Sequence, residues 1–315
     1  MSPKQSSPPR TTVALAADDR MVYGLIVLAS ALARTAQSPL RLVIGYFADE
    51  LSRRRRDLIG EYLTWRGIDH GFIESTPHEL FTERRHLTIT TFSKFVIADA
   101  LPEPHLWLDI DTIVRSGWDE IFTAINSAPA GASLVVANKI ESPHTRFEGF
   151  NAGVLGWTAS ARKPWVESLA ALPEKRFSSE QYLFNTLYGD GVVKVESSYN
   201  FLSSWHEELS LQPEPRIIHY SGPIKPWHLA RRHAPAWRTI NPTWEFWFTS
   251  EGEFLSEILG SPLEVRVARE RRRALFSGRL HTGKGALASW VMRALAVLGP
   301  FGTIIVRALQ QRSGR

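Results

Sequence analysis

The chain has 315 residues, of which 43% are hydrophobic and 22% charged, the composition of a folded protein with one large or two small domains. It contains no cysteine, which excludes disulfides, thiolate metal sites and a cysteine nucleophile. The net charge of +5 is unevenly distributed: residues 264–315 hold 11 Lys/Arg against two acids, and the remainder holds 26 against 30. This asymmetry argues against a nucleic-acid enzyme and predicts that the basic segment contacts something anionic.

Apolar runs and amphipathic repeats alternate along the chain. The apolar runs predict strands at residues 12–17, 40–47, 71–73, 106–110, 134–137, 150–157, 192–195 and 217–220. Helical periodicity predicts helices at residues 22–36, 51–65, 94–101, 121–126, 165–171 and 180–188. Such alternation is typical of an α/β domain with a largely parallel sheet, in which ligands bind beyond the carboxyl ends of the strands. The alternation stops near residue 248.

Two carboxylates follow one of the buried strands, in the segment His-Leu-Trp-Leu-Asp-Ile-Asp-Thr-Ile-Val that begins at His105. Residues i and i+2 of a strand share a face, so we expect Asp109 and Asp111 to point the same way. Neighbouring carboxylates repel each other and are costly to desolvate, and a hard divalent cation removes that cost. The pair therefore predicts a Mg²⁺ or Mn²⁺ site, or else two solvated acids at the start of a loop.

Four further segments carry polar groups beside predicted strand or helix ends. They read Ala-Leu-Ala-Ala-Asp-Asp at residues 14–19, Phe-Asn-Ala-Gly-Val-Leu-Gly-Trp at 150–157, Ser-Glu-Gln-Tyr-Leu-Phe-Asn at 179–185, and Ile-Ile-His-Tyr-Ser-Gly-Pro-Ile-Lys-Pro-Trp at 217–227. In the last segment, His219 is a candidate metal ligand, Gly222 would let backbone N–H groups approach a phosphate, and Lys225 would pair with its charge.

The Asp-x-Asp pair, Phe-Asn-Ala-Gly-Val and His-x-x-Gly-x-x-Lys-Pro-Trp, in this order, resemble the retaining glycosyltransferases of family 8. That family includes glycogenin and the bacterial lipopolysaccharide galactosyl- and glucosyltransferases, and the resemblance covers about residues 12–230. It implies a single nucleotide-sugar-binding α/β domain of the GT-A type, which moves a hexose from a UDP-sugar to an acceptor hydroxyl with Mn²⁺ (Mg²⁺ being possible) and retention of configuration. The expected organisation is a flexible start at 1–11, the transferase domain at 12–248, and a basic amphipathic helical tail at 249–315.

The resemblance also assigns roles to single residues. Asp109, Asp111 and His219 are similar to the family's metal ligands. Donor-binding positions follow from the matched segments; these are Ala16, Ala17, Asp18, Tyr23, Lys94, Asp109, Ile110, Asn151, Ala152, Gly153, Gly222 and Lys225. Glu180 and Gln181 stand where the family has its catalytic Asp-Gln.

Three positions depart from the family pattern. Met21 stands where an aromatic ring usually stacks on uracil, with Tyr23 two residues further on. Lys94 replaces an arginine and loses its bidentate fork. Glu180 replaces an aspartate, which moves a carboxylate by about 1 Å and bears on which hexose fits. Retention requires either a nucleophile on the far face of the sugar, for which Glu180 is better suited than Gln181, or same-face attack guided by the departing phosphate, which we favour.

The C-terminal segment has an amphipathic pattern. Its apolar positions share helical faces, interrupted by Gly299-Pro300; they are Leu287, Trp290, Val291, Ala294, Leu295, Leu298, Phe301, Ile304, Ile305 and Leu309. Residues 264–315 are thus expected either to anchor the protein on an anionic membrane or to pack on the body. With no apparent signal peptide and no apolar stretch of spanning length, the expected location is cytoplasmic, peripheral on the inner face of the membrane.

Two other functions remain open from the sequence. The chain could be a membrane-associated protein that binds sugar nucleotides or glycans with little turnover, or a phosphotransferase of the haloacid dehalogenase type.

Of the remaining conspicuous residues, Arg53–Arg56 are expected on a solvated helix face. Trp205 is expected in the core or facing an acceptor, and His86 on the surface or in an acceptor cleft. Packing is expected for Trp237, Trp244 and Trp247.

Overall fold

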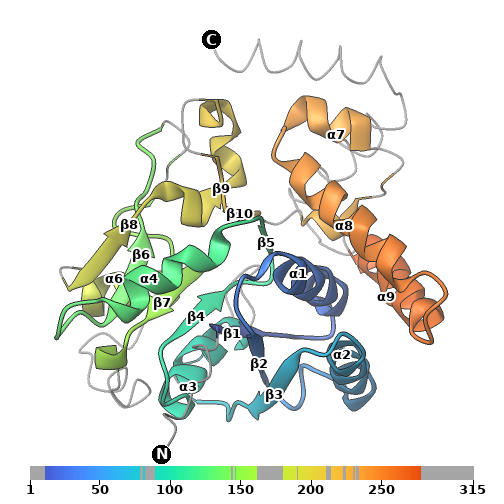
Figure 1. Cartoon of the computed structure of the whole chain (residues 1–315), viewed down its shortest axis with the longest axis horizontal. Coiled ribbons are helices and arrows are strands. Elements are labelled where there is room, and N and C mark those ends of the chain that lie inside the picture. Colours follow the sequence, from blue (N-terminus) through green and yellow to red (C-terminus); the bar gives the residue numbers. More distant parts are fainter. Residues whose placement is uncertain are drawn as a thin grey trace, which may run out of the picture.

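The computed structural model describes residues 11–78, 81, 89–142, 145, 147–161, 180–189, 191–210, 214–222, 225–229, 231 and 234–277. The described residues form a seven-stranded sheet in the order β3-β2-β1-β4-β7-β6-β8 (Figure 1). Its strands are β1 Thr11–Ala16, β2 Leu40–Tyr46, β3 Asp69–Glu74, β4 His105–Leu108, β6 Leu134–Ala137, β7 Val154–Trp157 and β8 Val192–Val195. Among the described strands of this sheet, β7 runs antiparallel to its neighbours β4 and β6, and the other pairings are parallel.

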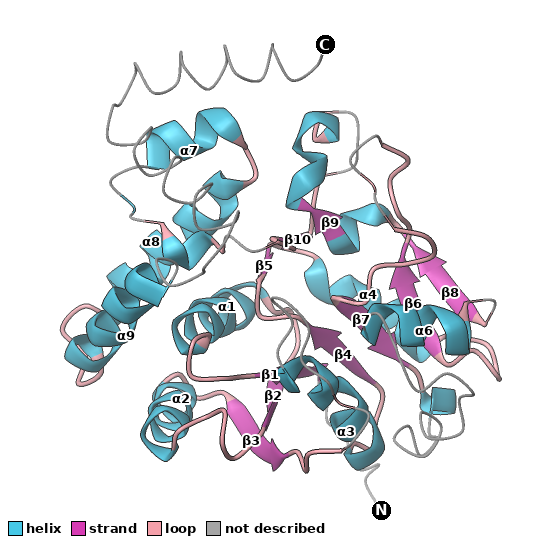
Figure 2. Cartoon of the chain, turned by 180° about the vertical axis from the view of Figure 1, so that it is seen from behind, coloured by secondary structure: helices cyan, strands magenta, loops and turns pink. Residues whose placement is uncertain are grey.

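Helices cover both faces of this sheet. The face in front in Figure 1 carries α1 Val22–Thr35, α2 Arg53–Trp65 and α4 Ile121–Asn126, and the face in front in Figure 2 carries α3 Ser93–Ala100 and α6 Glu180–Tyr188. Successive residues of β1 alternate between the two resulting cores: Val13 and Leu15 pack toward α1, and Ala14 and Ala16 toward α3. All six residues of β1 are buried, as expected for a central parallel strand.

A second, three-stranded sheet lies beyond the end of β4. It consists of β5 Thr112–Val114, β10 Ile217–His219 and β9 Phe201–Leu202, with β10 in the middle. β10 is antiparallel to β5 and parallel to β9. This small sheet is important for the site because it brings residues near position 219 back to the turn that follows β4.

The C-terminal described helices are α7 Ala234–Ile240, α8 Trp244–Ile258 and α9 Glu264–Ser277. α8 and α9 lie against α1, and Trp247, Phe254 and Val267 are buried in the same core as that helix. Residue 248, at which the sequence predicts the domain to end, falls inside α8, so the helix continues beyond that boundary. The described part of the chain has no helix long and apolar enough to cross a bilayer.

The α/β class and the mostly parallel sheet are confirmed. The predicted strand at 150–157 is shorter, because β7 begins only at Val154. Before it, the Asn151 side chain accepts a hydrogen bond from the Gly153 N–H at 2.9 Å, which forms a turn instead of continuing the ladder. The predicted helix at 165–171 and the amphipathic segment after residue 277 lie outside the described residues.

Candidate active site

A tight turn between β4 and β5 carries the two aspartates. The Asp109 carbonyl accepts hydrogen bonds from the Thr112 N–H at 3.1 Å and the Thr112 hydroxyl at 2.8 Å. The Asp109 N–H donates to the Gly153 carbonyl at 2.7 Å, which ties the turn to the segment before β7. Because β4 ends at Leu108, the expectation that both aspartates lie on one strand face is wrong. The turn, and not strand alternation, brings Asp109 and Asp111 together.

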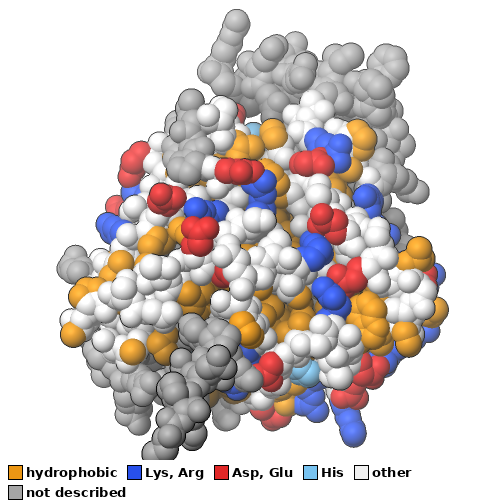
Figure 3. All heavy atoms as spheres, viewed as in Figure 1, with side chains coloured by type: hydrophobic (Ala, Val, Ile, Leu, Met, Phe, Trp, Pro, Cys, Tyr) orange, Lys and Arg blue, Asp and Glu red, His pale blue; other side chains and the backbone are white. Residues whose placement is uncertain are grey.

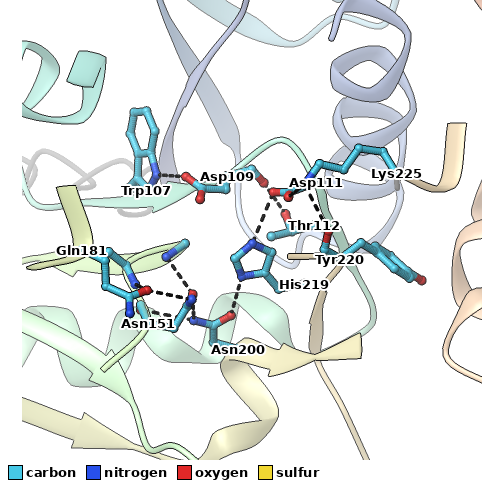
Figure 4. A network of polar contacts seen from close by, with 12 residues as sticks. Trp107, Asp109, Asp111, Thr112, Asn151, Gln181, Asn200, His219, Tyr220 and Lys225 are labelled. Carbon is cyan, nitrogen blue, oxygen red and sulfur yellow. Dashed lines mark hydrogen bonds and ion pairs between the residues drawn. The ribbon is translucent and has the colours of Figure 1, made fainter. Parts of the chain in front are cut away.

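The third candidate ligand comes from the small sheet. His219 lies opposite Thr112 in the β5–β10 ladder, and the Tyr220 N–H donates to the Asp111 carbonyl at 2.7 Å. This pairing places His219 Nε2 3.3 Å from Asp111 Oδ1 (Figure 4). One ligand atom from each of Asp109, Asp111 and His219 lies within 4.8 Å of the others, the arrangement expected of a divalent metal site.

A chain of amides fixes the tautomer of the histidine. The backbone N–H of Gly153 donates to Asn151 Oδ1, which also accepts from Asn200 Nδ2 at 3.0 Å. Asn200 therefore presents its Oδ1 to His219 Nδ1, 3.1 Å away, and Nδ1 must carry the proton. In the neutral imidazole, the lone pair of Nε2 then faces a carboxylate oxygen of Asp111, and these two acceptors have no hydrogen between them. A bound cation resolves this conflict, so the residues present fit a divalent metal.

Two lysines balance the negative charge of the site. Lys225 donates to Asp111 and also to the Tyr220 carbonyl at 3.2 Å. Burial alone would raise the pKa of Asp111, but the Lys225 ammonium beside it holds that pKa well below its usual range. Asp111 is therefore a carboxylate throughout the physiological pH range, the form that binds a metal.

Lys94 is fully buried and connects the donor and catalytic positions predicted from the sequence. Its Nζ lies 3.1 Å from the Ala152 carbonyl and 3.4 Å from a carboxylate oxygen of both Asp109 and Glu180. Burial lowers the pKa of Lys94, but the two carboxylates more than offset this and the pKa lies above its usual value. The Trp107 indole N–H also donates to Asp109, at 2.7 Å.

Gln181 extends the amide chain toward α6. Its Oε1 accepts from Asn151 Nδ2 at 3.0 Å and from the Ala152 N–H at 3.4 Å. The structure thus places Gln181, Asn151 and the metal-site histidine in one hydrogen-bonded row (Figure 4). Such a row holds the polar groups in a fixed geometry before any substrate arrives.

The turn after β1 lies at the same sheet edge, since β1 and β4 are parallel neighbours. Asp18, only 1% exposed, accepts from the Arg20 N–H at 2.8 Å and pairs with the Arg20 guanidinium at 3.0 Å. Ala16 and Ala17 precede it and are buried. Gly222, three residues before Lys225, has a φ of +152°, a backbone conformation that favours glycine.

Two predicted donor positions have other roles. Tyr23 is 2% exposed, and its hydroxyl donates to Glu251 on α8 at 2.7 Å, so the expectation that its ring meets the donor is not supported. The cause is α8, which covers the side of α1 that carries Tyr23. The Ile110 side chain is buried in the core, which leaves only its backbone for contact with a ligand.

Asn200 and Trp107 are site residues that the sequence analysis did not select. Asn200 precedes β9 and is 2% exposed, and the only local signal is a polar residue inside an apolar segment. Trp107 resembles a core residue of the strand before the aspartates. Trp205 is confirmed as a packing residue, with its indole N–H bonded to Thr145 at 2.9 Å. His86 and the Trp237 side chain lie outside the described part of the chain.

Comparison with known proteins gives a consistent result. The sequence model of "Glycosyl transferase family 8" matches residues 12–230. Two curated proteins of Streptococcus pneumoniae are similar: glycosyltransferase GlyD at 25% identity over 62% of this chain, and glycosyltransferase GlyE at 29% over 45%. The aligned parts span only 26% and 38% of those two proteins.

Among solved structures, galactosyltransferase LgtC in complex with donor and acceptor sugar analogs has a similar fold. Its TM-score is 0.55 at 23% identity, and the alignment covers 69% of this chain and 90% of LgtC. The central sheet and its flanking helices therefore form a GT-A fold. Because the family model matches well over half of the sequence, this chain belongs to glycosyltransferase family 8.

Proposed function

We propose that this glycosyltransferase is metal-dependent and retaining, and that it moves a hexose from a UDP-sugar to an acceptor hydroxyl of a cell-envelope glycan or glycolipid. The observation that carries the proposal is the convergence of Asp109 and Asp111, from the turn between β4 and β5, with His219 at the end of β10. A phosphotransferase of the haloacid dehalogenase type is disfavoured, because the family match is to a glycosyltransferase and the aspartate pair follows β4 instead of the first strand.

The metal would be held by the two carboxylates and His219 Nε2, a donor set suited to Mn²⁺ and also compatible with Mg²⁺. A divalent cation bound there supplies Lewis-acid stabilisation of a leaving diphosphate. The chain's own contribution is to keep Asp111 ionised and to hold His219 in the required tautomer. Lys225, next to Asp111, brings a further positive charge to the point where negative charge would develop.

The sugar would lie against the row of amides. Asn151 and Gln181 offer hydrogen-bonding groups to hexose hydroxyls, at the edge of the sheet where ligands bind in this fold class. Glu180 is 7% exposed and its carboxylate lies 3.4 Å from Lys94 Nζ, so it is poorly placed to act as a free nucleophile. This supports the same-face route, in which the departing diphosphate guides the acceptor.

The test is UDP release from a panel of UDP-sugars, with and without Mn²⁺ and with candidate acceptors. We expect release with one or a few hexose donors, and its loss in Asp109→Asn. The matched control is Asp49→Asn, an exposed aspartate outside the site, which should retain full turnover. Binding of a UDP-sugar without release would instead support a binding protein, and full turnover of Asp109→Asn with Mn²⁺ would contradict the metal assignment.

We further propose that the protein is cytoplasmic and associates with the inner face of the membrane through residues 264–315. Support comes from the excess of Lys/Arg and the apolar periodicity of this segment. Its first part is α9, and the rest follows directly in the chain. Residues 278–315 lie outside the described part, so this proposal is based on their sequence.

A further inference from the structure

Exposed hydrophobic side chains gather at one corner of the molecule. Within the described residues, the large hydrophobic side chains that are clearly exposed are Trp65 at 41%, Tyr182 at 45%, Leu259 at 73% and Val265 at 69%. Trp65 ends α2, Leu259 follows α8, and Val265 lies in the first turn of α9. Three of the four therefore lie at neighbouring helix ends, at the lower right in Figure 1.

Ion pairs lock these helix ends side by side. Arg66, just after α2, pairs with Glu257 of α8 at 2.9 Å, and Glu61 of α2 pairs with Arg266 of α9. At the other end of α2, Arg55 pairs with Glu270 of α9 at 3.0 Å. Residue numbers rise along α2 as they fall along α9, so the two helices are antiparallel. The C-terminus of α2 is therefore next to the N-terminus of α9.

Unpaired arginines lie on exposed sides of the same two helices, which are the outer side of α9 and the flank of α2 that borders α9. Arg54, Arg269 and Arg272 are exposed, and none has an ion pair with another described residue. Arg54 and Trp65 are eleven positions apart on α2, which places them on one side of that helix. Val265, Arg269 and Arg272 follow the i, i+4, i+7 spacing of one side of α9.

Most acidic residues near these arginines have a basic partner. Asp57 lies 3.9 Å from Arg53, Glu61 pairs with Arg266, and Glu270 is buried between Arg55 and Arg273. Glu264, beside Val265, has no ion pair with another described residue. The three exposed arginines therefore leave the surface with an excess of positive charge beside its exposed apolar groups. We call it the basic-apolar face and define it by Arg54, Trp65, Leu259, Val265, Arg269 and Arg272. Figure 3 shows hydrophobic, basic and acidic side chains mixed over this corner.

We propose that the basic-apolar face docks on an anionic phospholipid surface. Tryptophan prefers the boundary between headgroups and acyl chains, and arginine binds lipid phosphates with its planar fork. The two groups lie on rigid helices that are fixed to the body, so they would set an orientation as well as an affinity. The proposal rests on the membrane association proposed above for residues 264–315, and it adds the body helix α2 to the contact and places α9 in the same rigid surface.

The decisive variant changes α2, which is far from the tail in sequence. In the full-length chain, Arg54→Gln with Trp65→Ser removes one charge and one exposed ring. The matched control is Lys194→Gln with Tyr182→Ser, which removes the same kinds of group from β8 and α6 at the opposite edge of the sheet. Binding is measured by co-sedimentation with vesicles of phosphatidylcholine alone or with about a third phosphatidylglycerol.

One basic residue near an anionic membrane surface increases the partitioning of a protein from water to that membrane about fivefold. We expect the α2 double variant to need roughly tenfold more anionic lipid for half-binding. The control should stay within about twofold, and vesicles of phosphatidylcholine alone should bind weakly. Thermal unfolding checks that both double variants remain folded; the α2 variant should lose a little stability, because the Trp65 ring also packs on Tyr62, 6.1 Å away between ring centroids.

Two results would overturn the proposal. If the α2 double variant binds anionic vesicles as tightly as the unmodified chain, the tail alone makes the contact. If the unmodified protein does not bind vesicles that contain phosphatidylglycerol, the basic-apolar face is not a lipid-binding surface. Neither measurement uses a sugar nucleotide, so a failure here is distinct from a failure of the proposed transfer reaction.

Discussion

The Gly153→Ala substitution would test the metal site through its tightest contact. A Cβ at this position would lie 2.1 Å from His219 Cε1, far below the separation that real Cβ atoms tolerate. The backbone of Gly153 cannot retreat, because its carbonyl accepts from Asp109 and its N–H donates to Asn151. The imidazole must therefore rotate, which moves Nε2 away from Asp111.

The magnitude follows from the loss of one ligand. Perturbing the groups that orient a metal ligand costs about 10–100-fold in metal affinity. With free Mn²⁺ at about 100 times the Kd of the unmodified protein, binding raises the free energy of unfolding by about 2.7 kcal/mol. A hundredfold weaker site would gain only about 0.4 kcal/mol under the same conditions. Denaturant unfolding with and without Mn²⁺ measures this increment.

Gly156→Ala is the matched control. Its added Cβ would lie 2.6 Å from Ile125 Cγ1, a comparable clash that faces the core instead of the site. Both variants should lose about 1–3 kcal/mol in the absence of metal, the usual cost of overpacking. Only Gly153→Ala should also lose most of the increase in unfolding free energy that Mn²⁺ produces. An unchanged increment in Gly153→Ala would refute the assignment of His219 as a ligand.

Three further predictions concern buried charged or titratable groups. Lys94→Met leaves the carboxylate of Glu180 buried without its partner, so UDP release should be abolished and denaturant unfolding should show a loss of about 3–5 kcal/mol. Burial lowers the pKa of His105 to about 4, below its usual 6.5. The unfolded chain then binds the proton first, so stability should fall by about 3 kcal/mol as the pH drops from 7.5 to 4, and this part of the decline should vanish in His105→Phe. Glu270→Gln removes the carboxylate that Arg55 contacts between α2 and α9, and should lower the unfolding free energy by about 2–4 kcal/mol with no change in the Mn²⁺ increment.

Much of the fold could be predicted from local patterns. α4, α6, β6 and β8 have the predicted bounds, because each is a short apolar or amphipathic run that ends at a polar residue or glycine. The antiparallel direction of β7 could not be predicted in this way. A fully buried strand reads the same in either direction, and its orientation depends on the path of the chain between strands.

The site shows the same division. Asp109, Asp111 and His219 could be recognised in the sequence because polar groups at the ends of apolar strands are costly to desolvate unless they bind something. Asn200 was not, since its role depends on a contact with Asn151, forty-nine positions earlier. The error at Tyr23 has a similar origin: spacing placed it after the first acids, but only the packing of α8 on α1 decides where its ring points.

Counting charged residues along the sequence does not show how much of that charge is exposed and unpaired in the fold. The count gives an acidic body and a basic C-terminal segment, yet Arg266 and Arg271 of that segment pair with Glu61 and Glu251 of the body. Part of the charge difference between the two segments is therefore cancelled in the folded protein, because basic residues of one segment form ion pairs with acidic residues of the other. What remains unpaired on α9, Arg269 and Arg272, lies on its outer side. The charge available to an anionic surface is therefore set by pairing across helices, and this is why α2 belongs to the proposed docking face.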